Sequence, residues 1–210
     1  MIHVERQPPP PDFEERVGQP GRREIARLVE RYGSVDSIPS AALTPLWRRC
    51  LPQLHEAYGG ICAYVCHQIP RVTGGRTADH YVPKSAAPGR AYDWDNYRLA
   101  CSRMNARKHA AQDVLDPFEI EDGWFRVEFF GFQVHPDWEL DEPVRSLVAA
   151  TIRRLDLNDY ACRRDREDFV MDYTEGRTSF ALSDFGIPRD LGPASKEVHL
   201  WLGIEGIRKP

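Results

Sequence analysis

The sequence predicts an α+β protein, in which short strands and helices occupy separate stretches of the chain. Two stretches, residues 23–33 and 142–155, repeat apolar residues at the spacing of a helix. Three others, residues 61–69, 78–82 and 124–134, are short, apolar or alternating, and rich in β-prone residues. We therefore expect a small β-hairpin core with helices on its N-terminal and C-terminal sides.

Length and composition agree with this class. The chain has 210 residues, of which 41% are hydrophobic and 29% charged, as in a globular protein of one domain or two small ones. It has no apolar run of about 18 residues, and its N-terminus lacks the apolar centre of a secretory signal. We therefore expect a soluble, cytoplasmic protein with no membrane partner. Its five cysteines are then expected to be thiols or metal ligands: Cys50, Cys62, Cys66, Cys101 and Cys162.

Composition divides the chain into four segments. Residues 1–22 are Pro-rich and are expected to form an extended arm that docks either on the domain or on a partner. Residues 23–59 are predicted to be helical, residues 60–120 to form the core, and residues 121–210 to form a helical and mixed extension. A protein partner is expected at the arm or at the acidic C-terminal half.

Glycines mark the ends of the N-terminal helices. Gly33 suits the end of the first helix, whose apolar face holds four residues: Ile25, Leu28, Val29 and Tyr32. Residues 39–60 are predicted to hold one or two more helices, ending at the Gly59–Gly60 pair. Residues 61–69 and 78–82 then form the predicted hairpin, and a helix is expected around residues 99–111.

The C-terminal extension is predicted from three patterns. Residues 124–134 alternate enough for one or two strands. Residues 142–155 form a strongly amphipathic helix with six residues on its apolar face: Val144, Leu147, Val148, Thr151, Ile152 and Leu155. Residues 159–176 continue as another helix that stops at Gly176, and mixed short elements follow from Thr178.

The net charge of −4 is unevenly distributed along the chain. Between Cys62 and His109 only three acidic residues stand against eight basic ones: Arg71, Arg76, Lys84, Arg90, Arg98, Arg103, Arg107 and Lys108. A basic segment in an otherwise acidic chain predicts an anionic ligand such as nucleic acid. The alternative is a solvated surface that happens to be basic.

Polar residues occupy particular places in the predicted core. Asp79 and His80 are adjacent on a strand, so their side chains are expected on opposite faces, one to bind a metal and one to handle a proton. Asn96 falls in the following loop. Asn105 and His109 are four residues apart on the predicted helix, so both project from one face and can share a metal ion.

This order and spacing resembles the HNH endonucleases, whose nuclease unit is a ββα-metal motif. The resemblance rests on Asp-His at 79–80, Asp-Asn at 95–96 and Asn-Ala-Arg-Lys-His at 105–109, and it covers roughly residues 60–120. Residues around these motifs are also similar to a bacterial subgroup of the family. Some family members of this size serve in anti-phage systems beside an ATPase.

The resemblance implies a metal-dependent endonuclease that hydrolyses phosphodiester bonds, with DNA as the expected substrate. His80 would be the general base, and Asn96 would fix the loop or orient His80. Asp79, Asn105 and His109 would hold one divalent cation, Mg²⁺ or Mn²⁺, with Zn²⁺, Ni²⁺ or Co²⁺ also tolerated by the imidazole. Four basic residues would contact phosphates, with Lys108 expected to contribute more than Arg107: Lys84, Arg103, Arg107 and Lys108.

The sequence departs from the family at a structural zinc site. Many HNH proteins hold zinc with two Cys-x-x-Cys pairs, whereas Cys62 and Cys66 have three residues between them. Met104 stands where the partner of Cys101 would fall, and a thioether is a poor zinc ligand. We therefore expect no structural zinc, with the thiols packed as small apolar groups.

Two alternatives to the enzyme stay open. The chain could be a non-catalytic nucleic-acid-binding module on an HNH-like scaffold, or a regulatory subunit assembled through its arm or its acidic half. The presence of both His80 and Asn105 favours the enzyme, because a decayed site is expected to lose its base first.

Overall fold

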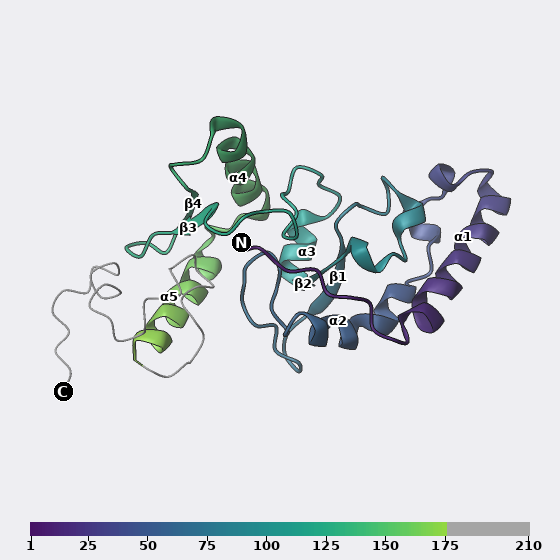
Figure 1. Cartoon of the computed structure of the whole chain (residues 1–210), viewed down its shortest axis with the longest axis horizontal. Helices are drawn as coiled ribbons and strands as arrows, with labels where there is room; N and C mark the ends of the chain where they lie inside the picture. The colour runs from purple at the N-terminus through teal and green to yellow at the C-terminus, as the bar shows by residue number, and fades with distance from the viewer. Residues whose placement is uncertain (176–210) are drawn as a thin grey trace. The chain divides into compact units, whose positions relative to one another are not determined.

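The computed structural model describes residues 1–175, which have an α+β fold with five α-helices and two small antiparallel sheets (Figure 1). They fall into two compact units. One unit comprises Val4–Glu119, and the other comprises Met1–His3 with the residues from Ile120 onward. The second unit thus resumes one residue before the extension predicted from residue 121.

Helical structure begins inside the segment predicted as an extended arm. A short π-helix, η1 (Glu14–Gly18), runs directly into α1 (Gln19–Tyr32), so residues 14–22 are helical. Pro20 lies in the first turn of α1, where its ring suits the helical φ but it has no N–H to donate to the preceding turn, η1. As predicted, α1 ends at Gly33, whose φ of 86° costs little in a residue without Cβ.

The N-terminal arm docks on its own unit. Trp94 Nε1 donates a hydrogen bond to the carbonyl of Gln7 at 2.8 Å, and the N–H of Val4 donates to the carbonyl of Pro117 at 2.8 Å. Three of the four prolines in the run 8–11 are exposed. Of the two sequence alternatives for the arm, docking on the domain is the one observed.

After the short turn η2 (Val35–Ser37), residues 39–60 form helices that end at Gly59 and Gly60, both with positive φ. The number of short helices is larger than predicted: η3 (Ser40–Ala42), η4 (Leu46–Cys50) and α2 (Leu51–Ala57). Because η4 and α2 both pack against the first strand of the sheet, this segment forms one side of the central hairpin.

The central hairpin joins β1 (Arg76–His80) to β2 (Tyr97–Cys101), and α3 (Ser102–Lys108) follows β2 directly. The strands pair antiparallel, with His80 opposite Tyr97. The predicted helix around residues 99–111 therefore starts too early. Residues 97–101 pair with β1 and are mostly buried, and this tertiary pairing outweighs their helix-compatible composition.

Residues 61–69 do not form the partner strand that the sequence predicted. Only an isolated bridge joins Ile61 to Gln68. Between them the chain turns tightly: the N–H of Cys66 donates to the carbonyl of Cys62 at 2.9 Å, and Cys66 has φ of 60°. Alternating apolar residues serve here to fill a turn, and β1 pairs with β2 instead.

The C-terminal unit contains the hairpin β3 (Phe125–Val127) and β4 (Val134–Pro136), followed by two helices, α4 (Glu142–Leu155) and α5 (Tyr160–Thr174). Both predicted helices are confirmed, although Leu147 of the predicted apolar face of α4 is half exposed. The predicted stop at Gly176 and the elements from Thr178 lie outside the described residues. Within residues 1–175, no helix is long and apolar enough to cross a bilayer.

Candidate functional site

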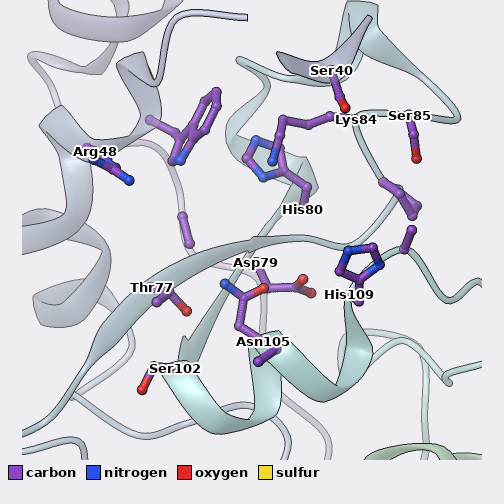
Figure 2. A pocket seen from close by; sticks show the side chains of 15 residues that line it. Ser40, Arg48, Thr77, Asp79, His80, Lys84, Ser85, Ser102, Asn105 and His109 are labelled. Atoms are coloured by element: carbon purple, nitrogen blue, oxygen red, sulfur yellow. The ribbon is translucent and has the colours of Figure 1, made fainter.

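A pocket of about 480 Å³ opens at the end of β1 in the Val4–Glu119 unit. Its walls come from β1, the start of the loop after β1, α3, and the short helices η3 and η4 (Figure 2). Of the residues predicted to form the site, five line this pocket: Asp79, His80, Lys84, Asn105 and His109. Asp79 and His80, expected on opposite faces of a strand, thus border one space because β1 ends at His80.

His80 is a buried, neutral imidazole held by the backbone. Its Nε2 lies 2.9 Å from the carbonyl oxygen of Ala91. A carbonyl only accepts hydrogen bonds, so Nε2 carries the proton and Nδ1 is the basic nitrogen. Burial, helped by the nearby cation of Lys84, lowers the pKa of His80 to about 3. The ring is therefore uncharged throughout the physiological pH range.

Aromatic rings fix the plane of the His80 imidazole. The Trp47 ring meets it edge-on with centroids 4.8 Å apart, and the Tyr97 ring does so at 5.2 Å. The Tyr97 hydroxyl also donates to the carbonyl of Ala91, at 2.9 Å. The acceptor that sets the His80 tautomer is thus itself held in place.

Asn96 positions the loop and does not belong to the described lining of the pocket. Its side chain accepts a hydrogen bond from the N–H of Val82 at 2.8 Å. Its Nδ2 lies 3.1 Å from the carbonyls of both Val82 and Arg90. This clamp draws together the two ends of the loop that presents Ala91 to His80, which corresponds to the positioning role that the resemblance implies.

Asp79 belongs to a buried polar network. The Tyr64 hydroxyl donates to its Oδ2 at 2.5 Å, and Lys108 Nζ lies 3.1 Å from Oδ2 and 3.3 Å from Oδ1. Lys108 Nζ also reaches the carbonyls of His80 and Tyr81 at 3.1 and 3.0 Å. Burial raises the pKa of Asp79, while Lys108 and Tyr64 oppose that shift by stabilising the carboxylate.

The prediction that Lys108 contacts phosphates, and more strongly than Arg107, is therefore wrong. The Lys108 side chain has 0% exposure, and its ammonium forms an ion pair with Asp79 and hydrogen bonds to two backbone carbonyls. Arg98, another member of the basic segment, is likewise buried, in an ion pair with Asp116. Part of the charge that suggested a nucleic-acid surface is thus internal.

The other predicted phosphate contacts differ in their relation to the pocket. Lys84 lines it, with its Nζ 4.6 Å from the centroid of the Trp47 ring, and burial lowers the pKa of this ammonium. Arg103 is exposed and Arg107 is partly exposed, and neither is among the described residues that line the pocket. Lys84 is consequently the predicted cation best placed for a ligand in the pocket.

Asn105 and His109 reach the pocket from the end of α3. Asn105 lies on the helix, whereas His109 is the residue after it, with φ of 46°, and its N–H donates to the carbonyl of Asn105. Figure 2 shows the Asn105 amide and the Asp79 carboxylate directed toward the same space, with His109 beside them. One carboxylate, one amide and one imidazole are donors that suit a divalent cation.

Two features of these donors bear on metal binding. Tyr64 occupies Asp79 Oδ2, so Oδ1 is the carboxylate oxygen more open to a cation, although Lys108 lies 3.3 Å from it. Among the described residues, no three or more His, Cys, Asp or Glu side chains are grouped as a metal site. The donor types fit one hard cation, with Asn105 supplying an amide oxygen and water the remaining positions.

Three residues of the site are not predicted by the sequence pattern. Trp47 and Arg48 of η4 line the pocket although they lie outside the segment that resembles a nuclease, and Tyr64 anchors Asp79 from the tight turn. The Trp-Arg-Arg run at 47–49 carried a signal, an aromatic residue beside two cations, but only the fold brings it to His80.

Two cysteines of the core, Cys62 and Cys101, are in contact. The N–H of Cys101 donates to Cys62 Sγ at 3.4 Å, Cys62 has no exposed surface, and Met104 is buried. The hydrogen bond from the Cys62 thiol lowers the pKa of Cys101 to about 6, whereas burial raises that of Cys62. The absence of a structural zinc stays a prediction.

Comparison with known proteins gives no family. No protein-family model matches the chain. A UPF0312 protein of Shewanella sp. (strain W3-18-1) is 62% identical over 34 residues, and one of Azotobacter vinelandii is 57% identical over 35. These stretches cover 16% and 17% of the chain and 18% of each relative, so the chain spans less than a fifth of the curated relatives it matches. Their name states no activity.

Proposed function

We propose that the protein is a metal-dependent endonuclease of the HNH type that hydrolyses phosphodiester bonds in DNA. The observation that carries the proposal is the state of His80: a neutral imidazole whose Nε2 is bound to the Ala91 carbonyl and whose ring borders a pocket. Asn105, His109 and Asp79 line the same pocket on a β1–β2–α3 unit. This combination supports the resemblance because it supplies both a base and metal donors.

In this proposal His80 Nδ1 takes a proton from the water that attacks phosphorus, and the bond from phosphorus to the 3′ oxygen breaks, with the leaving 3′ oxygen taking a proton from solvent water. The imidazolium so formed keeps its hydrogen bond to the Ala91 carbonyl, which favours the protonated ring. Lys84, beside the ring, favours its neutral form and would offset the phosphate charge. Lys108 holds the carbonyls of His80 and Tyr81, and Asn96 holds the backbone of Val82 and Arg90, so both residues position the chain that follows His80.

A divalent cation, when bound, would neutralise phosphate charge and stabilise the leaving oxygen. Asp79 Oδ1 and Asn105 are the residues that would hold it, with His109 as a third donor. Mg²⁺ or Mn²⁺ suits the oxygen donors, and Zn²⁺, Ni²⁺ or Co²⁺ the imidazole.

The general base is tested by cleavage of supercoiled plasmid with Mg²⁺, Mn²⁺ or EDTA. We expect His80→Ala to reduce the rate about 10²–10⁴-fold, the usual loss for a missing general base. The matched control is Tyr97→Phe, which removes the other hydrogen bond to Ala91 but keeps the imidazole. Cutting by His80→Ala at the rate of the unaltered protein would exclude His80 as the base.

The metal site is tested by titration calorimetry with Mn²⁺. Asn105→Ala should weaken binding, whereas Ser102→Ala, at the start of the same helix and lining the same pocket, should not. His109→Ala should have a smaller effect than Asn105→Ala, because oxygen donors and water can still hold a hard cation. Equal affinities in all three variants would place the metal elsewhere.

One observation favours the second candidate, a non-catalytic DNA-binding module. Lys108 already neutralises Asp79, and its ammonium would repel a cation bound at that carboxylate. DNA binding without cleavage under any of the three metal conditions would favour this module. For either function we propose a bacterial, cytoplasmic protein, with a protein partner at the arm or the acidic half and a role in anti-phage defence.

A further inference from the structure

The wall of the pocket opposite α3 is built by residues outside the ββα unit. Trp47 and Arg48 come from η4, and Ser40 comes from the start of η3. Figure 2 shows Arg48, His80 and Lys84 on one side of the pocket, with Asp79, Asn105 and His109 on the other. The two sides therefore carry different chemistry.

Trp47 ties this wall to His80. Its edge-on contact with the imidazole and the position of Lys84 Nζ over its face place a cation next to the proton acceptor. Burial lowers the pKa of Lys84, which means that the ammonium has lost part of its hydration. A partly dehydrated cation beside a pocket gains most from an anionic ligand.

The charges of the pocket do not balance internally. Asp79 and Lys108 neutralise each other, and His80 is uncharged. Lys84 and Arg48 remain, and neither forms an ion pair with a described residue, so this side of the pocket carries an excess of positive charge. One phosphate engages one such cation most simply, and two cations on one wall suit two phosphates.

Arg48 and its neighbour Arg49 differ in their contacts. Arg48 and Arg49 are both exposed, but Arg49 Nη1 donates to the carbonyl of Arg16 at 3.1 Å and is not among the described lining residues. Arg48 has no such hydrogen bond within the described residues and borders the pocket. The two residues are therefore a matched pair for experiment.

We propose that Arg48 forms a subsite for the phosphate next to the one served by His80 and Lys84, with Trp47 holding Lys84 in place. The ligand is then a DNA strand with at least two consecutive phosphates rather than a mononucleotide. The inference rests on the proposed function only in assigning the reacting phosphate to His80. The subsite itself is a binding site and can be tested without cleavage.

The test is fluorescence anisotropy of labelled duplex and single-stranded DNA at several salt concentrations. It is measured in Ca²⁺, and every protein variant also carries His80→Ala so that the DNA is not cut. One lost phosphate contact should flatten the slope of log affinity against log salt by about 0.9 on duplex and about 0.7 on a single strand. At about 0.15 M salt this corresponds to a roughly fivefold loss of duplex affinity for Arg48→Ala. Arg49→Ala should change neither quantity, and Arg48→Lys should retain most of the affinity.

Equal effects of Arg48→Ala and Arg49→Ala on affinity and slope would overturn the subsite, as would an Arg48→Ala variant with unchanged slope. These outcomes are independent of the cleavage assay. If His80→Ala still cuts plasmid while Arg48→Ala alone flattens the slope, the proposed mechanism fails and the subsite stands. If His80→Ala abolishes cutting while Arg48 and Arg49 behave alike, the reverse holds.

Discussion

The two sides of the pocket use lysine in opposite ways. On the α3 side, Lys108 has no exposed surface, and its ammonium is bound by Asp79 and two backbone carbonyls. On the η4 side, Lys84 rests over an aromatic ring and forms no ion pair with a described residue. The number of lysines and arginines in a segment therefore does not identify a ligand surface. A lysine stabilises the fold at one position and is available to an anion at another.

The largest expected effect on stability comes from a substitution on the α3 side of the pocket. Lys108→Met leaves the Asp79 carboxylate buried without its cation, and such a loss typically costs about 3–5 kcal/mol in the free energy of unfolding. Urea denaturation measures it. Adding Asp79→Asn to Lys108→Met removes the remaining charge and should restore part of the stability. A loss below about 1 kcal/mol, as for an exposed pair, would show that Lys108 is not buried with Asp79.

A smaller effect is expected at the hydroxyl that shares the same carboxylate. Tyr64→Phe removes a hydrogen bond to a charged acceptor, worth about 1.5–3 kcal/mol. Tyr97→Phe is the matched control, because Tyr97 is equally buried but donates to a neutral carbonyl, worth about 0.5–1.5 kcal/mol. Urea denaturation of both variants should rank Tyr64→Phe as the more damaging, and the opposite ranking would contradict the network around Asp79.

The pH dependence of stability tests whether the η4 side keeps His80 away from water. The pKa of His80 is about 3 in the folded protein, and its ordinary value is 6.5. As pH falls from 6.5 toward 3, the unfolded chain therefore takes up a proton that the folded protein refuses, and stability is lost. The loss attributable to His80 approaches about 1.4 kcal/mol per pH unit within this window.

Thermal or urea unfolding of the unaltered protein and His80→Gln, compared from pH 7 to pH 4, isolates this contribution. Glutamine does not titrate, so the free energy of unfolding of the unaltered protein should fall more steeply than that of His80→Gln as pH falls. Parallel pH profiles would mean that His80 is hydrated in solution.

The smallest effect is expected for the same substitution at the other lysine. Lys84→Met loses the cation over Trp47, worth about 0.5–1 kcal/mol at a partly exposed site, but also removes a partly dehydrated charge. The free energy of unfolding should therefore change by less than about 1 kcal/mol. A loss as large as that of Lys108→Met would remove the distinction between the two sides of the pocket.

Periodicity and spacing predicted the elements that depend on local sequence. The helices at residues 23–33 and 142–155 and the breaks at Gly33, Gly59 and Gly60 follow from apolar spacing and from the conformational freedom of glycine. The pairing of β1 was not predictable in the same way. Residues 61–69 and 97–101 are both short and apolar, and the choice between them depends on a turn around Cys66 and on burial against the rest of the unit.

The candidate site divides along the same line. The motif spacing identified the residues near the end of β1 and at α3, and all but Asn96 among the proposed catalytic and metal residues line one pocket. Spacing could not reveal that Lys108 points inward, because its orientation is set by the buried Asp79 carboxylate. Nor could it place Trp47 and Arg48 beside His80, since no periodic pattern links η4 to β1.

The bond between His80 and the Ala91 carbonyl has a consequence for mutational tolerance. Because the acceptor is a backbone oxygen, no substitution at position 91 can delete it, so the chemistry of the side chain there is unimportant to the tautomer of His80. The size of that side chain does matter, because Ala91 is fully buried and a larger residue would push the loop away from the ring. The tautomer of His80 is thus insensitive to the chemistry of the side chain at position 91 but sensitive to its size.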